Sequence, residues 1–126
     1  MLRLALDSGA MGKRNRGIGR MSAATSDYED HEGNVLTLRG SISPLTRRKY
    51  ASVLHDQGKT TDDSWHRAVE FLYERLVERW TIYEVPTEGQ KELLQRYRIA
   101  TNDERRWIRE VLRQHLAAHF PDIEAP

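Results

Sequence analysis

The sequence predicts an all-α protein: a small four-helix bundle-like domain that follows a disordered N-terminal arm. Apolar residues recur at three- and four-residue spacings through most of residues 43–120, and capping residues stand where these periodic segments begin. Only short connections separate the segments, so they would pack most simply as antiparallel neighbours. We therefore expect a single helical domain over residues 34–126, with helices at about 44–57, 62–83, 87–100 and 102–120.

Length and composition narrow the class of protein. With 126 residues, the chain can bury one hydrophobic core without disulfides or structural metals. It has no cysteine, which excludes thiol nucleophiles and cysteine-ligated metals and is typical of a cytosolic protein. The 20 Lys and Arg nearly balance the 19 Asp and Glu, and no apolar run approaches the roughly 18 residues that a membrane span needs. We expect a cytoplasmic protein that does not insert into a membrane.

The first part of the chain lacks the apolar content of a folded segment. Residues 1–20 carry five basic side chains and one acidic one, and residues 26–33 carry four acidic side chains and no lysine or arginine. Neither block has enough apolar side chains to offset the loss of conformational entropy on ordering, about 1–2 kcal/mol per residue. We predict that residues 1–33 form a disordered arm, basic and then acidic. The weak alternation of residues 35–42 predicts an extended lead-in that packs on the helices, because a lone strand would have no partner.

The first two helices are predicted from their ends and their apolar faces. In the first, Ser43 is an expected N-cap, Pro44 suits the first turn and Gly58 stops the helix. The second begins at Thr61, with two aspartates at the positive end of the helix dipole. Its apolar stripe has helical spacing and predicts the central helix of the bundle: Trp65, Val69, Leu72, Leu76 and Trp80.

The last two helices each begin with capping-box spacing. Thr87 and Gln90 give this spacing for the third helix, and Thr101 and Glu104 give it for the fourth. The fourth helix ends before Pro121, which cannot continue it.

Two histidines stand one helical turn apart on the apolar side of the fourth helix, His115 and His119. This spacing suits two ligands of one metal ion, but the glutamate of an HExxH motif is missing. A carboxylate from Glu84 or Glu88 would add a ligand if the fourth helix ran parallel to the second. We favour core imidazoles that are hydrogen-bonded locally, and we keep metal binding as an alternative function.

Nucleic-acid binding is a second alternative. The short turn between the last two helices is compatible with a helix-turn-helix, whose second helix enters the major groove. Three consecutive bases also open the first helix, although residues 86–120 carry only seven basic against five acidic side chains. The candidate residues are Arg47, Arg48, Asn102, Arg105, Arg106 and Arg109.

A non-enzymatic role is the main functional prediction. No nucleophile elbow organises the Ser, His and Asp residues, and no glycine-rich loop follows a predicted strand. Phe71, Val77 and Trp107 lie beside the apolar stripes, and aromatic side chains in such positions are enriched at interfaces. We expect an interaction or accessory protein that uses these three residues to bind a protein partner or a second copy of itself, without a cofactor.

Overall fold

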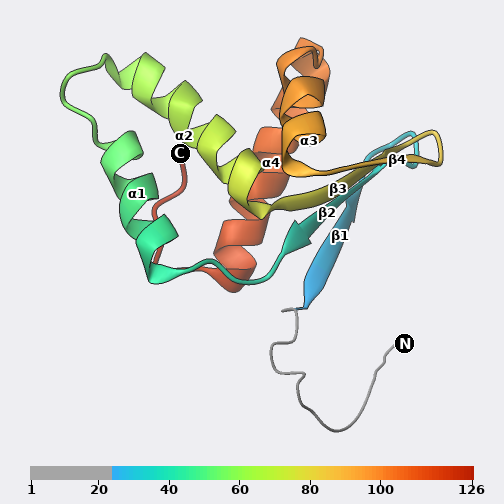
Figure 1. Ribbon diagram of the computed structural model, residues 1–126, viewed down its shortest axis with the longest axis horizontal. Helices are drawn as coiled ribbons and strands as arrows, with labels where there is room; N and C mark the ends of the chain where they lie inside the picture. Colours follow the sequence, from blue (N-terminus) through green and yellow to red (C-terminus); the bar gives the residue numbers. More distant parts are fainter. Residues whose placement is uncertain (1–23) are drawn as a thin grey trace, which may run out of the picture.

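The computed structural model describes residues 24–126, and Figure 1 shows that they combine a sheet with helices. Within these residues the architecture is α+β, with a four-stranded antiparallel sheet and four helices. The prediction of an all-α, four-helix bundle-like domain is therefore wrong. None of the helices in the same residues is long and apolar enough to cross a bilayer.

The sheet is built from consecutive antiparallel neighbours. In spatial order its strands are β1 (Thr25–Glu29), β2 (Val35–Arg39), β3 (Val77–Ile82) and β4 (Val85–Glu88). β1 lies in the segment that we expected to be disordered, so that expectation is wrong for residues 24–33. The rest of the predicted arm, residues 1–23, lies outside the described residues. The extended lead-in of the sequence prediction is β2, and it has strand partners on both sides.

Two helices lie between strands along the chain, and two more follow the last strand. They are α1 (Pro44–Leu54), α2 (Thr61–Leu76), α3 (Gln90–Arg98) and α4 (Asn102–His119). α1 and α2 connect β2 to β3, and α3 and α4 follow β4 (Figure 1). The N-cap predicted at Ser43 and the capping box predicted at Thr101 and Glu104 are both confirmed. The capping box predicted at Thr87 is absent, because this residue belongs to β4 and Gly89 precedes α3.

The largest boundary error is at the end of α2, where the predicted helix to residue 83 becomes a strand. The backbone turns extended at Val77, with φ −75° and ψ 124°. Trp80 follows Leu76 by four residues, which fits a helix, yet its position opposite Leu36 in β2 equally suits a buried strand residue. Short apolar segments do not distinguish these two periods, and β-branched residues such as Val77 and Thr81 favour the strand.

The core lies between one face of the sheet and the helices. Both contribute side chains that are at most 1% exposed, among them Leu36, Leu38, Leu72, Tyr73, Leu76, Trp80, Ile108, Leu112 and Leu116. Burying each such side chain contributes about 1.5–3 kcal/mol. The buried stripe predicted for the fourth helix is thus present, but it packs against a sheet and not only against other helices.

Polar side chains cover the opposite face of the sheet, across all four strands of the described residues. Asp27, Thr37, Arg79 and Glu88 are successive partners in the strand register. Thr37 Oγ1 donates to Asp27 Oδ1 over 2.7 Å, and Arg79 Nη1 donates to Glu88 Oε2 over 3.0 Å. A polar face opposite a buried one is the usual arrangement of an antiparallel sheet, and in β2 it accounts for the alternation of Leu36 and Leu38 with Thr37.

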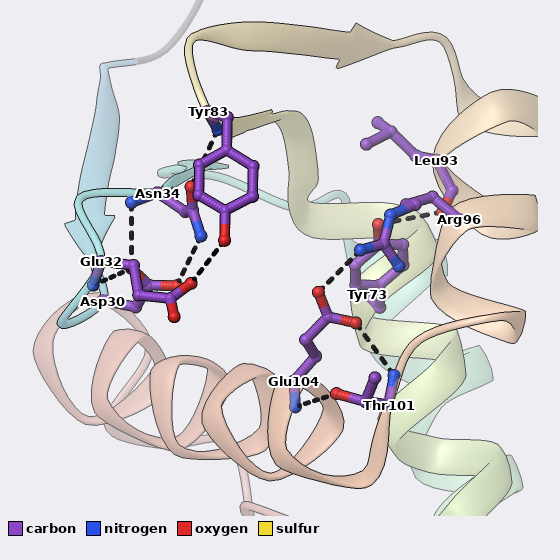
Figure 2. Close-up of polar contacts among 9 residues, drawn as sticks. All are labelled: Asp30, Glu32, Asn34, Tyr73, Tyr83, Leu93, Arg96, Thr101 and Glu104. Atoms are coloured by element: carbon purple, nitrogen blue, oxygen red, sulfur yellow. Dashed lines mark hydrogen bonds and ion pairs between the residues drawn. The ribbon is translucent and has the colours of Figure 1, made fainter.

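The hairpin between β3 and β4 has an unusual tip. Tyr83 and Glu84 have φ values of 48° and 68°, a region that favours glycine or asparagine. Two hydrogen bonds hold the tip against the turn that follows β1, as Figure 2 shows: the Tyr83 amide donates to Asn34 Oδ1 and its hydroxyl donates to Glu32 Oε1. These bonds offset the cost of a strained turn.

We expect Glu84→Gly to stabilise the protein by up to about 1 kcal/mol. The left-handed conformation costs an L-residue about 1–2 kcal/mol, and glycine avoids this cost. Glycine also has more backbone freedom in the unfolded chain, which cancels about 0.5–1 kcal/mol of the gain. The free energy of unfolding in urea measures the difference. Glu110→Gly, in an exposed position of α4, should instead destabilise the protein by about 1 kcal/mol. Equal destabilisation by both substitutions would contradict a strained tip.

Candidate functional site

A cleft of about 270 Å³ lies where α2, the end of α3 and the first turns of α4 meet. Its lining is Trp65, His66 and Val69 from α2, Tyr97 from α3, and Asn102, Arg105, Arg106 and Arg109 from α4. We call it the arginine cleft. Its lining contains three guanidinium groups and no carboxylate.

Hydrogen bonds at the start of α4 fix the wall of the arginine cleft. Thr101 and Glu104 form the capping box, and Arg96 of α3 donates to the same glutamate over 2.7 Å (Figure 2). Burial acts to raise the pKa of Glu104, but the hydrogen bonds from Arg96 and Thr101 prevail and lower it. Helices α3 and α4 are therefore joined next to Tyr97 and Arg105 by a charge-assisted contact that is only partly exposed.

Two arginines of the cleft lie over aromatic rings. The Cζ atom of Arg105 is 4.9 Å from the centre of the Tyr97 ring, and that of Arg109 is 4.9 Å from the centre of the Trp65 ring. A guanidinium group that stacks through its face keeps its in-plane N–H groups for other acceptors. Arg105 uses one of them to donate to the Arg98 carbonyl over 2.9 Å. Both forks are thus partly ordered before any ligand binds.

The same two arginines lack a carboxylate partner. Within residues 24–126, six other arginines lie within ion-pair distance of one: Arg39, Arg47, Arg79, Arg96, Arg98 and Arg106. In this part of the chain Arg105 and Arg109 have none, and the buried Nε of Arg105 has no hydrogen-bond acceptor. Arg106 is paired with Asp103 over 2.9 Å, at an exposed position on the rim. The cleft therefore holds two positive charges that no acidic side chain compensates.

Four of the six residues predicted for nucleic-acid binding line the cleft, and the two from α1 do not. Arg47 pairs with Asp122 over 2.9 Å and lies over the ring of Phe120, so it holds the C-terminal residues against α1. Arg48 is exposed. Sequence reasoning missed Trp65, His66 and Tyr97 as cleft residues.

His115 and His119 attach the sheet to α4. His115 is fully buried, with Nε2 2.7 Å from the Arg39 carbonyl and Nδ1 2.7 Å from the Tyr28 hydroxyl. Because a carbonyl only accepts, we infer that Nε2 carries the proton and that the Tyr28 hydroxyl donates to Nδ1. His119 is exposed and its Nε2 lies 3.1 Å from Ser26 Oγ. Only His115 fits the interpretation of a hydrogen-bonded core residue.

The carboxylates proposed as further metal ligands lie elsewhere. Glu84 is at the exposed tip of the β3–β4 hairpin, and Glu88 accepts from Arg79 on the sheet face opposite the core. In the part of the chain that the structure describes, no group of three or more His, Asp or Glu side chains is arranged to hold a metal ion. The metal alternative assumed that α2 continued to residue 83, whereas that segment is β3.

The predicted partner-binding residues do not share one surface. Val77 is 2% exposed and belongs to the core. Phe71 is half-buried, between the ring of Tyr50 and the guanidinium of Arg75. Trp107 lies on the flank of α4 away from Arg105 and Arg109, in a second cleft of about 490 Å³ that Arg106 also lines. Acidic side chains line that second cleft: Asp30, Glu32, Asp103, Glu104 and Glu110.

Comparisons of this chain with protein-family models, with curated proteins and with solved structures found no match. We therefore infer function from the geometry of the arginine cleft.

Protonation of His115 should make the protein less stable at mildly acidic pH. Burial lowers the pKa of His115, the hydrogen bond to Arg39 opposes this shift, and the charge of His119 adds to it. Below the usual histidine pKa of about 6.5 the unfolded chain then binds a proton that the folded chain does not. As the pH is lowered from about 7, the free energy of unfolding should decrease by at most about 1.4 kcal/mol per pH unit. The decrease ends once the pH lies below the pKa of His115 in the folded protein.

Urea denaturation at a series of pH values, in wild type and His115→Gln, measures this dependence. His115→Gln should flatten the profile between about pH 5 and 7, and His119→Gln, a change one turn away at an exposed position, should keep most of it. A profile that His119→Gln flattens and His115→Gln leaves intact would contradict the assignment.

Proposed function

We propose that this protein is a non-enzymatic interaction protein that recognises an anionic group of its partner in the arginine cleft. The observation that carries the proposal is the pair Arg105 and Arg109, stacked on aromatic walls and without a carboxylate partner in the described residues. Arginine forks held in this way match carboxylate or phosphate oxygens at a small cost in side-chain entropy.

Binding fits the lining of the cleft better than catalysis. Acid–base chemistry needs a group that exchanges protons near neutral pH. Burial raises the pKa of Tyr97, although Arg105 lowers it, and the lining contains no carboxylate. His66 is an exposed side chain whose Nε2 lies 3.5 Å from Asp62 Oδ2. The cleft thus offers hydrogen-bond donors and positive charge but no arranged acid and base.

Nucleic-acid binding by α4 has weaker support. A recognition helix projects its base-reading side chains away from the protein, into the major groove. Arg105 and Arg109 instead lie over rings of α3 and α2. Residues 24–126 also carry 18 acidic and 15 basic side chains, so their net charge does not favour a long polyanion. A single anionic group, on a protein partner or on a second copy of this chain, would interact mainly with the positive charges of the cleft and little with the acidic side chains elsewhere.

Titration of the full chain with hexaglutamate and with phenyl phosphate, followed by calorimetry, tests the proposal. We expect at least one of these anions to bind, more weakly as salt increases, because exposed charges are screened. Arg105→Glu and Arg109→Glu should each weaken binding at least about tenfold, or about 1.4 kcal/mol.

Arg113→Glu is the matched control, since Arg113 is exposed on the same helix and lies outside the lining of the cleft. It should leave the affinity nearly unchanged. Loss of binding in Arg113→Glu equal to that in Arg109→Glu would count against the cleft, and failure of both anions to bind would overturn the proposed function.

A further inference from the structure

We infer that the group bound in the arginine cleft is a phosphate monoester, an inference that rests on the proposed function and names its ligand class. Number of donors, charge and space favour a phosphate monoester over a carboxylate. The small free aromatic surface of the cleft favours it over a nucleic-acid strand as well.

The donors of the cleft exceed what a carboxylate can use. One guanidinium fork already uses about half of the roughly four acceptor positions of a carboxylate when it forms a bidentate pair of hydrogen bonds. The cleft has three guanidinium groups, those of Arg105, Arg106 and Arg109, and the side-chain amide of Asn102. A phosphate monoester presents three terminal acceptor oxygens, so it can accept from two or three of these groups at once.

The uncompensated charge also matches a dianion. Arg105 and Arg109 contribute two positive charges without an acidic partner in the described residues, and a carboxylate would neutralise only one of them. A phosphate monoester carries between one and a half and two negative charges near neutral pH, by the typical second pKa of about 6. The ion pair of Arg106 with Asp103 is exposed on both sides, so its rearrangement toward a ligand costs little.

The first turn of α4 adds to this potential. Helix α4 begins at Asn102, which lines the cleft, so the positive end of the helix dipole lies at the cleft. This contribution is small beside that of the two guanidinium groups, at typically 0.3–1 kcal/mol for an exposed helix end. Asp103 and Glu104 in the first turn offset part of it, so the charge argument depends on the two guanidinium groups.

The shape of the cleft favours recognition of the phosphate group itself. At about 270 Å³ it is slightly smaller than the roughly 300–1,000 Å³ of pockets that enclose drug-sized ligands. Guanidinium groups already cover one face of Trp65 and one face of Tyr97, so the cleft has less free aromatic surface than sites that stack successive bases of a single strand. The remainder of the ligand, a peptide or a small molecule, would lie outside.

Three ligands with the same ring test the charge and the number of oxygens, in calorimetric titrations of the full chain: phenyl phosphate, phenyl sulfate and benzoate. We expect phenyl phosphate to bind at least about tenfold more tightly than benzoate, with phenyl sulfate between them, because the sulfate has the same terminal oxygens and a single charge. Affinity for phenyl phosphate should rise with pH from about 5 to 7, as the second proton of the phosphate is lost.

Arginine-to-lysine variants test whether the planar guanidinium group of Arg109 is needed for binding or whether its positive charge is enough. Arg109→Lys keeps the charge but loses the planar fork and the stack on Trp65, and it should weaken phenyl phosphate binding at least about fivefold. Arg113→Lys, outside the cleft, should bind as wild type does. Circular dichroism and the thermal midpoint confirm that each variant is folded, so a loss of affinity reports on the cleft.

Further titrations identify the source of the phosphate and the outcomes that overturn the inference. A phosphoserine peptide that binds more tightly than phenyl phosphate would indicate a phosphorylated protein, and a nucleoside monophosphate that does so would indicate a small molecule. Benzoate or hexaglutamate binding as tightly as phenyl phosphate would overturn the phosphate inference and leave the proposed function intact. Duplex or single-stranded nucleic acid binding more tightly than every monoester would also overturn it. No binding of any anion would overturn both proposals.

Discussion

The arrangement of the whole domain depends on the burial of one face of α4 against the sheet. Ile108, Leu112 and Leu116 are at most 1% exposed, and His115 on the same face is hydrogen-bonded to both β1 and β2. Once this face is buried, the helical repeat decides where every other side chain of α4 lies. By rotation alone, Arg105 falls about 60° and Arg109 about 100° from Ile108, on one flank of the buried stripe.

That flank position explains how two arginines reach aromatic rings and still offer donors to a ligand. A long side chain at the edge of a buried stripe lays its stem along apolar surface and keeps its charged head near solvent. Trp107 and Glu110 fall on the other flank, where the second cleft is acidic. Burial of a single apolar stripe thus places Arg105 and Arg109 on one side of α4 and Trp107 and Glu110 on the other.

Sequence reasoning predicted the parts of the fold that depend on local signals. The cap at Ser43, the capping box at Thr101 and the apolar stripe of α4 are all determined within one or two helical turns. The strands were missed for two physical reasons. The β3–β4 hairpin turns at Tyr83 and Glu84 without the glycine or asparagine that marks such a turn, and β2 pairs with β3 across the inserted α1 and α2. Contacts that are distant in sequence also hold β1 in place. Tyr28 of β1 is ordered by a hydrogen bond to His115, which lies 87 residues further along the chain, and no local pattern reports it.

The candidate site was predicted in part for the same reason. The four-residue interval between Arg105 and Arg109 is visible in the sequence and places both on one side of α4. The roles of Trp65 and Tyr97 as its walls require the packing of three helices, and so could not be read from one helix at a time. For the histidine pair we favoured core imidazoles, and His115 is one. The metal alternative needed a carboxylate at the end of a helix, and that segment is a strand.

Several arginines of this chain lie over aromatic rings, and some of these also form an ion pair. In residues 24–126 five arginines lie over rings, where roughly one or two would be typical of this length. They are Arg47, Arg75, Arg96, Arg105 and Arg109. Arg47 and Arg96 also pair with a carboxylate, and Arg75 stands apart from the arginine cleft.

Only at the arginine cleft, within the same residues, do two stacked and uncompensated guanidinium groups lie together. Two like charges in one cleft repel each other, and a nearby acidic side chain would relieve that repulsion. Six other arginines of these residues pair with carboxylates. In the described part of the chain Arg48, Arg67, Arg75 and Arg113 also lack an ion pair, but none of them lines the arginine cleft, where Arg105 and Arg109 lie together. An anion supplied by a partner accounts for two uncompensated charges in one cleft more directly than any structural role of the pair.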